Sequence, residues 1–353
     1  MTIYSPFKAA HHLERISKLR NGELINPTQV QIDLTNRCNH RCPYCFYRCA
    51  KSKTLNALFN EKDFISFDTV KRLLAELEEC GKPALQFTGG GEPFVHDEIY
   101  AILDETVSRG FEYAIVTNGT LMDTSFVDLY EKAAWIRVSV DAATSETYAK
   151  TQGGSVEDFH NVMKLLRVLV VDCPNVVVGI SFVVNPINWK EILEATENAK
   201  NAGVDNIRLS VAYTPKGMEI FRDKWSDIEQ LAHQAKKLET DDFKVFNLIT
   251  AHLENLDLKQ KGYTFCGYQH FTAVIGADQI VYPCCTLKYN SVTGFGSLKE
   301  SSFKDIWFGE KRKMWLEIDH LKAVCDKHPC WMDGKNSFIS YLVNNHAPHV
   351  NYI

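Results

Sequence analysis

Three cysteines, Cys38, Cys42 and Cys45, lie within eight positions of one another in the segment CNHRCPYC. Thiolates bind soft metals, and a [4Fe–4S] cube normally takes four of them, one for each iron. Three thiolates would leave one iron with a free coordination position, as in catalytic rather than structural metal centres. A zinc loop is the alternative interpretation, with His40 or Cys49 as the fourth ligand.

Short polar motifs follow three further apolar segments. Glycines allow a backbone to approach a ligand closely, and a carboxylate can accept hydrogen bonds from an ammonium group. A single polar residue at such a position could equally cap a following helix. The candidate residues are Gly90, Gly91 and Glu92 in TGGGEPF, Asn118 in VTNG, and Ser139 and Asp141 in VSVDA.

The elements that must position these residues alternate between two patterns. Apolar segments typical of buried strands cover 28–35, 84–89, 112–117, 134–140, 175–184 and 206–211. Helical segments follow at 66–83, 97–110, 124–132, 155–170, 189–202 and 225–238, the first with Ser66 as N-cap. This alternation predicts an α/β fold with a parallel sheet covered by helices on both faces. Six units are fewer than the eight of a closed barrel, so we expect a partial (β/α)6 barrel or open sheet, with chemistry at the strands' carboxyl ends.

Composition and pattern divide the chain into three regions. We expect an N-terminal helical extension over 1–27, the core over 28–240, and a linker with a small cysteine-rich domain over 241–353. Within the last region, 271–285 has the pattern of a β-hairpin and 297–315 that of helix.

The cysteine motif, with Tyr44 at the aromatic position, resembles the CxxxCxφC signature of radical S-adenosylmethionine (radical SAM) enzymes. The resemblance implies that Cys38, Cys42 and Cys45 hold a [4Fe–4S] cluster whose open iron is chelated by SAM. It also implies reductive cleavage of SAM to a 5′-deoxyadenosyl radical, which abstracts a hydrogen atom from the substrate. The cofactors then carry the difficult chemistry, and the protein supplies placement.

The same resemblance assigns the polar motifs to SAM. Residues 90–92 match the family's GGE motif, which contacts the SAM amino group. Ser139 and Asp141 occupy positions suited to the ribose hydroxyls, and Tyr44 and Asn118 also lie at family positions near SAM. The fifth strand lacks the later glycine and glutamate of the family's GxIxGxxE pattern, so no residue on it is assigned.

The later cysteines resemble the C-terminal extension called SPASM, or its shortened form, Twitch. The resemblance implies one auxiliary [4Fe–4S] cluster with the ligands Cys266, Cys284, Cys325 and Cys330. With four thiolates, every iron of that cluster would have a protein ligand, and the cluster would serve electron transfer or stabilise the fold. If Cys285 takes the place of one of these ligands, or if one iron has no protein ligand, the cluster could bind substrate. A structural zinc on the same four thiolates is the alternative.

Charge and hydropathy exclude other classes of function. A net charge of −5 argues against broad binding of nucleic acid, although EKRKMW could form a local basic patch. The N-terminus has no apolar segment typical of a secretory signal, and no stretch reaches the ~18 apolar residues of a membrane span. We therefore expect a cytoplasmic protein, in which the 11 cysteines are metal ligands or free thiols rather than disulfides.

These features predict a radical SAM enzyme that acts on a small organic molecule or a peptide side chain. An electron donor such as flavodoxin or ferredoxin is expected, and no catalytic residue beyond the cofactor ligands is assigned. About 27 residues precede the first strand, too few for a separate leader-peptide domain, which favours a small substrate or a leaderless peptide. Radical modification of a nucleoside or nucleic acid, and a zinc-ordered binding protein without catalysis, are the alternatives.

Overall fold

The computed structural model describes residues 5–48, 56–212, 220–251, 261–325 and 330–344. Its strands form one ten-stranded sheet in the order β10-β9-β8-β1-β2-β3-β4-β5-β6-β7. The strands are β1 (Gln29–Asp33), β2 (Ala84–Thr88), β3 (Tyr113–Thr117), β4 (Trp135–Ser139), β5 (Val177–Val184), β6 (Asn206–Val211), β7 (Lys244–Asn247), β8 (Thr272–Ile275), β9 (Ile280–Tyr282) and β10 (Gly296–Ser297). All neighbours from β8 to β7 pair in parallel, whereas β8, β9 and β10 pair antiparallel.

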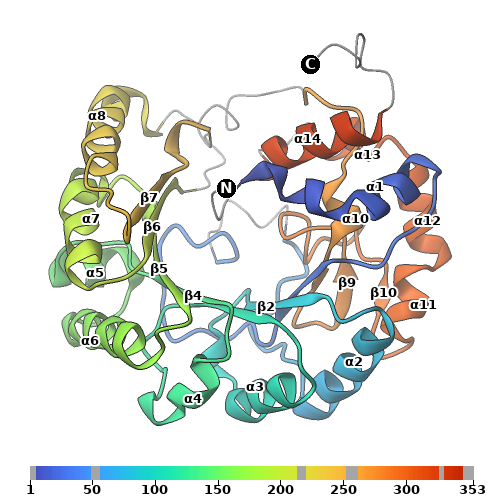
Figure 1. Ribbon diagram of the computed structural model, residues 1–353, viewed down its shortest axis with the longest axis horizontal. Coiled ribbons are helices and arrows are strands. Elements are labelled where there is room, and N and C mark those ends of the chain that lie inside the picture. The colour runs from blue at the N-terminus through green and yellow to red at the C-terminus, as the bar shows by residue number, and fades with distance from the viewer. Residues whose placement is uncertain (1–4, 49–55, 213–219, 252–260, 326–329, 345–353) are drawn as a thin grey trace.

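Helices cover the outside of this curved sheet (Figure 1). The α-helices are α1 (Leu13–Arg20), α2 (Phe67–Glu79), α3 (Ile99–Ser108), α4 (Val127–Tyr130), α5 (Ser145–Gln152), α6 (Val156–Asp172), α7 (Ile192–Asn201), α8 (Trp225–Lys236), α10 (Tyr268–Phe271), α11 (Phe303–Trp307), α12 (Glu310–Glu317), α13 (His320–Ala323) and α14 (Asp333–Val343). The 3-10 helices are η1 (Pro6–His12), η3 (Pro93–Val95), η4 (Thr124–Phe126), η5 (Trp189–Glu191) and η7 (Arg222–Lys224). Within the described ranges, none of the helices combines the length and apolar character needed to cross a bilayer.

The six strand predictions are confirmed as β1 to β6, and the partial barrel is confirmed with them. The predicted helix start at Ser66 is confirmed as well. The Ser66 hydroxyl accepts a hydrogen bond from the backbone N–H of Thr69 and caps α2. One strand and one α-helix between β1 and β7 were missed, and α10, α13, α14 and β10 of the C-terminal region were not predicted either. The segment expected to be a linker contains β7, and the loop after β4 contains α5, which is only eight residues long.

The C-terminal region continues the sheet of the core. The predicted hairpin is confirmed as β8 and β9, but β8 also pairs in parallel with β1. The expected helical segment 297–315 contains two short helices, α11 and α12, with Gly309 between them. The helices α1 and α14 contact each other, and Figure 1 shows them side by side on the same flank as α12. The domain boundaries stay a prediction, because one sheet runs through both regions.

A buried ion pair joins the two regions at the end of β1. The Lys288 ammonium lies 2.5 Å from a carboxylate oxygen of Asp33, and both side chains are almost completely buried. The same oxygen accepts hydrogen bonds from the Tyr289 hydroxyl and from the backbone N–H of Gly90. Burial disfavours a charged lysine, but Asp33 and Tyr47 outweigh that effect and raise the pKa of Lys288 above its ordinary value.

Replacement of Lys288 by methionine should destabilise the fold strongly. The change leaves Asp33 as an uncompensated buried charge, and breaking such a pair costs about 3–5 kcal/mol. Chemical denaturation of the full chain would measure the loss in the free energy of unfolding. As a matched control, Lys313→Met breaks a solvent-exposed pair with Glu310 and should cost less than about 1 kcal/mol. Equal small losses in both variants would show that the buried pair does not stabilise the junction.

Candidate active site

The loop that follows β1 carries Cys38, Cys42 and Cys45 at the carboxyl end of the sheet, where a parallel α/β fold presents its functional groups. A turn brings the backbone N–H of Cys45 within 3.1 Å of the Cys42 carbonyl oxygen. All three thiols are partly exposed. Burial raises the pKa of Cys42, and the neighbouring Cys45 and Cys38 raise it further, so the three thiols lie in one electrostatic neighbourhood.

Arg48 fixes this loop to the rest of the site. Its guanidinium donates to the Asn36 carbonyl oxygen at 2.7 Å and to the Gly90 carbonyl oxygen at 3.2 Å, and it pairs with Glu61 at 2.9 Å. Phe59 lies beneath the guanidinium, 5.6 Å from it. An arginine with several fixed acceptors holds a loop more rigidly than a single contact does. The sequence offered no signal for Arg48 beyond its proximity to the motif.

The glycine loop after β2 passes directly against the cysteine loop. The backbone N–H groups of Gly91 and Glu92 donate to the carbonyl oxygens of Thr35 and Arg37, at 3.1 and 2.8 Å. A Cβ atom on Gly91 would lie 2.0 Å from the Arg37 carbonyl oxygen, and one on Gly90 would lie 2.3 Å from the Asn36 side chain. Gly91 is therefore required by the approach of one backbone to another, and Gly90 by the side chain of Asn36. Their contact with SAM stays a prediction.

Glu92 joins the glycine loop to the end of β3. Its buried carboxylate accepts hydrogen bonds from the Thr117 hydroxyl at 2.6 Å and from the backbone N–H groups of Asn118 and Phe94, at 2.7 and 3.1 Å. Burial raises the pKa of Glu92 to about 7, although these hydrogen bonds favour the ionised form. The Asn118 side chain continues the network and donates to Asn39 of the cysteine loop at 2.8 Å.

Asp141 joins the cysteine loop to the ends of β4 and β5. The Tyr44 hydroxyl donates to one oxygen of this buried carboxylate, and the backbone N–H of Val183 donates to the other at 2.6 Å. Burial raises the pKa of Asp141 to about 6. Gln152, on the unpredicted helix α5, donates to the Ser139 carbonyl oxygen at 2.9 Å and accepts from the Asp141 backbone N–H at 2.8 Å.

The seven residues expected to contact SAM therefore gather around the cysteine loop, at the carboxyl ends of β2, β3 and β4. The structure brings Tyr44 and Asp141 into direct contact, and it connects Glu92 with Asn118. Ser139 contributes its backbone to the hydrogen bonds described above. Sequence reasoning missed the connecting residues Arg48 and Gln152, because neither belongs to a motif.

The C-terminal cysteines form a second electrostatic neighbourhood. Burial raises the pKa of Cys284, and the thiols of Cys285, Cys330, Cys325 and Cys266 each raise it further. The structure thus brings together the four expected ligands and Cys285, so the identity of the fourth ligand stays open. Cys49, the alternative ligand of the first site, lies outside the described residues.

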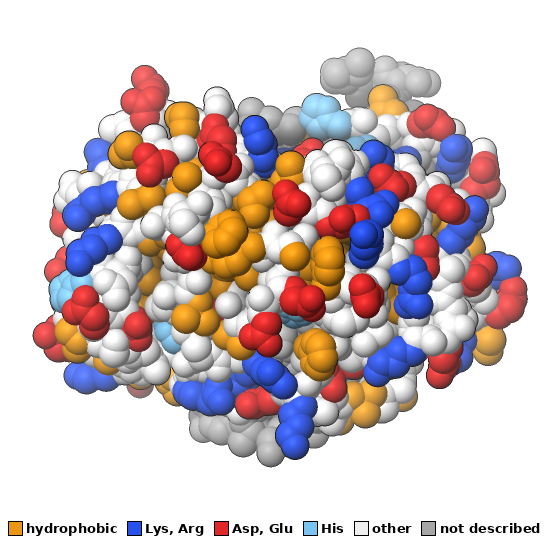
Figure 2. All heavy atoms as spheres, turned by 90° about the horizontal axis from the view of Figure 1, so that it is seen from below, with side chains coloured by type: hydrophobic (Ala, Val, Ile, Leu, Met, Phe, Trp, Pro, Cys, Tyr) orange, Lys and Arg blue, Asp and Glu red, His pale blue; other side chains and the backbone are white. Residues whose placement is uncertain are grey.

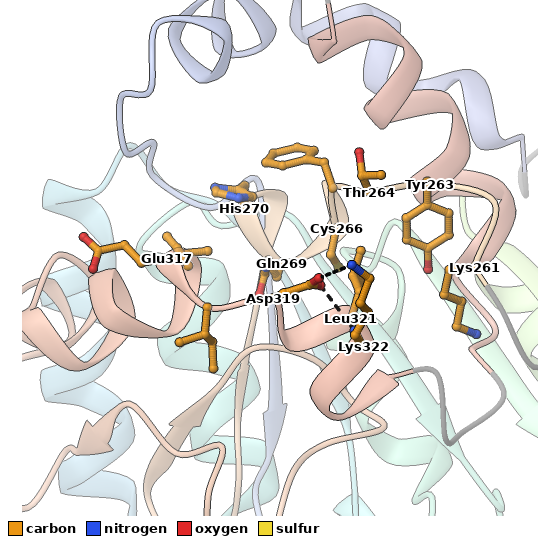
Figure 3. Close-up of a pocket in the computed structure, with 13 residues that line it drawn as sticks. Lys261, Tyr263, Thr264, Cys266, Gln269, His270, Glu317, Asp319, Leu321 and Lys322 are labelled. Carbon is orange, nitrogen blue, oxygen red and sulfur yellow. Dashed lines mark hydrogen bonds and ion pairs between the residues drawn. The ribbon is translucent and has the colours of Figure 1, made fainter.

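A cavity of about 400 Å³ opens beside Cys266. Figure 3 shows Tyr263, Gln269 and His270 around it, with the ion pair between Asp319 and Lys322 marked on its other side. Burial raises the pKa of Cys266 to about 11, and a hydrogen bond from Asn336 works in the opposite direction. Space lined by both polar and apolar side chains therefore adjoins this thiol.

Both cysteine groups offer several thiols, the ligands that hold iron–sulfur clusters. In the part of the chain that the structure describes, no three His, Cys, Asp or Glu side chains converge on a point that could hold one metal ion. A cluster requires no such convergence, because each thiolate binds a different iron atom. The raised pKa values of the thiols refer to the protein without metal, and iron would favour the thiolates.

Replacement of Glu92 by glutamine should change how stability depends on pH. An unfolded glutamate has a pKa of 4.5, so the raised value favours folding with the proton bound. This contribution is complete below about pH 4.5 and is lost as the pH rises through about 7. Wild type should therefore lose stability relative to Glu92→Gln between pH 5 and pH 8. Chemical denaturation at several pH values would measure the difference, and a constant difference would contradict the expectation.

Comparison with known proteins identifies two parts of the chain. Residues 32–194 match the Radical SAM superfamily, and residues 266–331 match SPASM, an iron–sulfur cluster-binding domain. The tungsten-containing aldehyde ferredoxin oxidoreductase cofactor-modifying protein of Pyrococcus furiosus is 25% identical over 313 residues, which cover 82% of this chain and 83% of that protein. An S-adenosylmethionine-dependent nucleotide dehydratase of Selenomonas ruminantium is 29% identical over 123 residues, 34% of this chain and 41% of that protein.

The fold is also similar to that of a solved structure. Streptococcus suis SuiB, crystallised with S-adenosylmethionine, gives a TM-score of 0.64 at 16% identity, covering 88% of this chain and 73% of SuiB. Membership of the superfamily implies SAM and a [4Fe–4S] cluster as cofactors, and the SPASM match supports an auxiliary cluster. The chain is an enzyme of the radical SAM superfamily that carries a C-terminal SPASM domain.

Proposed function

We propose that this enzyme abstracts a hydrogen atom from a small organic molecule or a peptide side chain. The observation that carries the proposal is the grouping of three partly exposed thiols at the carboxyl end of β1, beside the glycine loop after β2. Cys38, Cys42 and Cys45 would hold the cluster. When bound, the cluster and SAM supply a 5′-deoxyadenosyl radical as the hydrogen-abstracting group.

The chain's own residues would hold SAM at the open iron. The backbone of Gly90 and Gly91 and the Glu92 carboxylate would receive the amino group, while Ser139 and Asp141 would receive the ribose hydroxyls. Hydrogen bonds within the chain already fix the carboxylates of Glu92 and Asp141. Preorganised groups of this kind place a ligand without reorganising themselves, which favours a controlled geometry at the reacting atom.

The second cysteine group would hold the auxiliary cluster through Cys266, Cys284, Cys325 and Cys330. A cluster closed by four thiolates suits electron transfer: it would accept the electron of the substrate radical or pass an electron to the first cluster. An external donor such as flavodoxin or ferredoxin would supply the electron that starts the reaction. We also propose that residues 28–240 form the core and 241–353 the auxiliary domain, as composition suggests.

A nucleotide is the second candidate substrate. The relative from Selenomonas ruminantium is named as a nucleotide dehydratase, and its similarity covers part of this chain. The net charge of −5 argues against a polymeric nucleic acid but not against a free nucleotide. Deuterium transfer from labelled candidate substrates into 5′-deoxyadenosine would distinguish the substrate classes directly.

Replacement of single cysteines should separate the two groups. After anaerobic reconstitution we expect about eight irons per chain if both clusters have the proposed ligands. Cys42→Ala removes a ligand of the cluster that binds SAM, so 5′-deoxyadenosine should fall to background on reduction. Cys325→Ala should largely retain SAM cleavage but lose product formation.

Cys80→Ala provides a control, because Cys80 is a buried thiol at the end of α2, outside both groups. It should retain the iron content and the SAM cleavage of wild type. The assignment fails if Cys42→Ala still forms 5′-deoxyadenosine at the wild-type rate, or if the reconstituted chain binds zinc and no iron.

A further inference from the structure

Two arginines project from the inner face of the sheet. The residues on either side of Arg137 in β4, and on either side of Arg208 in β6, belong to the main hydrophobic core. Because side chains alternate along a strand, both arginines point the opposite way from that core. The Arg208 guanidinium donates to the Ser181 hydroxyl on the intervening strand β5 at 3.0 Å, which places it over the inner face. Arg137 lies over the Trp135 ring, 5.0 Å from its centre.

A lysine from the C-terminal region joins these arginines. Lys335, on α14, lies 5.6 Å from the centre of the Tyr268 ring. Burial lowers the pKa of Lys335, and the positive charges of Lys8, Arg137 and Arg208 lower it further, while Cys285 has the opposite effect. Cations carried by β4, β6, α14 and η1 therefore share one electrostatic neighbourhood, although the elements are far apart in the sequence.

The basic cluster, defined as Arg137, Arg208 and Lys335, adjoins both cofactor sites: Ser181, which accepts from Arg208, pairs with Ser139 in the sheet, and Lys335 lies against Tyr268, two residues after Cys266. Arg208 lowers the pKa of Asp141, whose carboxylate is held by Tyr44 of the cysteine loop. Lys335 interacts with Cys285 of the second cysteine group. A molecule bound by the basic cluster would therefore lie within reach of both sites.

The inner face around the basic cluster is polar as well. Gln29 and Gln86 form a hydrogen bond of 2.8 Å across β1 and β2, and Gln31 donates to the Tyr268 hydroxyl at 3.3 Å. The interior of a packed barrel is filled mainly by bulky branched side chains. The inner face of this sheet instead carries amide and guanidinium groups, so a polar ligand would find hydrogen-bonding partners there.

The location of the positive charges favours a small anion as the ligand of the basic cluster. The chain as a whole has a net charge of −5, and Figure 2 shows acidic and basic side chains interspersed over one outer face. Arg137 and Arg208, by contrast, point to the inner face, where a long polyanion would have little access. A planar guanidinium group can donate two parallel hydrogen bonds to a phosphate or carboxylate group. Several cations together favour a ligand with several negative charges.

We propose that Arg137, Arg208 and Lys335 bind the phosphate groups of a small phosphorylated substrate between the two cofactor sites. The inference rests on the proposed function for the role of this ligand as substrate, and it narrows that function to one chemical class. Arg137 and Arg208 supply planar guanidinium groups from β4 and β6, with β5 between them, and Lys335 adds a point charge from the C-terminal region. Binding of the substrate would thereby involve both regions of the chain.

Binding of inorganic triphosphate to the anaerobically reconstituted full chain tests this proposal. Isothermal titration calorimetry at low ionic strength should detect binding to wild type. Arg137→Gln and Arg208→Gln should each weaken it by about tenfold or more, because each removes charge-assisted hydrogen bonds. Lys335→Gln, at a partly buried position on α14, should also weaken binding, and it leaves the strands of the sheet unchanged.

The control is Arg167→Gln, which makes the same substitution at an exposed position of α6. It should leave the affinity for triphosphate unchanged. Equal weakening by Arg167→Gln and by the three cluster variants would show nonspecific attraction and overturn the proposal. Absence of triphosphate binding to wild type, or tighter binding of citrate than of triphosphate, would also overturn it.

These outcomes are separate from those that test the reaction. Loss of SAM cleavage in wild type would remove the proposed function, whereas triphosphate binding through the basic cluster would still stand. Conversely, a chain that cleaves SAM but binds no triphosphate keeps its function and loses the phosphate assignment. Arg208→Lys retains the positive charge but lacks the planar guanidinium group. If its affinity for triphosphate lies between those of Arg208→Gln and wild type, the recovered part comes from the charge and the rest from the guanidinium hydrogen bonds.

Discussion

The ion pair between Asp33 and Lys288 is the interaction on which the junction of this enzyme depends. It is buried, and its two charges come from distant parts of the chain, one at the end of β1 and the other just after Cys284 and Cys285. Buried charges are tolerated only when they are paired and hydrogen-bonded. The core therefore needs the Lys288 ammonium of the C-terminal region, and the C-terminal region needs the Asp33 carboxylate of the core. The pair thereby sets the position of the second cysteine group relative to the loop of the first.

Close approach of backbones explains the rigidity of the first site. The glycine loop contacts the cysteine loop through backbone hydrogen bonds, and Gly91 leaves no room for a Cβ atom. Arg48, Glu92 and Asp141 then connect the loop to the ends of neighbouring strands. Groups fixed in this way can hold a reactive cofactor at a defined distance from substrate, and radical chemistry requires such placement.

Prediction from the sequence succeeded where the determining signal was local. The apolar periods of β1 to β6 and the cap at Ser66 depend on residues close in sequence, and the cysteine spacing identified the family together with its cofactors. It failed at β7 and α5, whose short patterns fall below what periodicity can detect. Arg48 and Gln152 were missed because their importance comes only from contacts made after folding.

The sequence by itself determined the types of chemistry available: two groups of thiols, a glycine loop and polar residues at strand ends. Only the tertiary structure decided how they meet. It paired β8 with β1, buried Lys288 against Asp33, and placed Arg137 and Arg208 on the inner face. The physical reason is that local propensity acts over a few residues, whereas burial and charge pairing act between segments that only folding brings together.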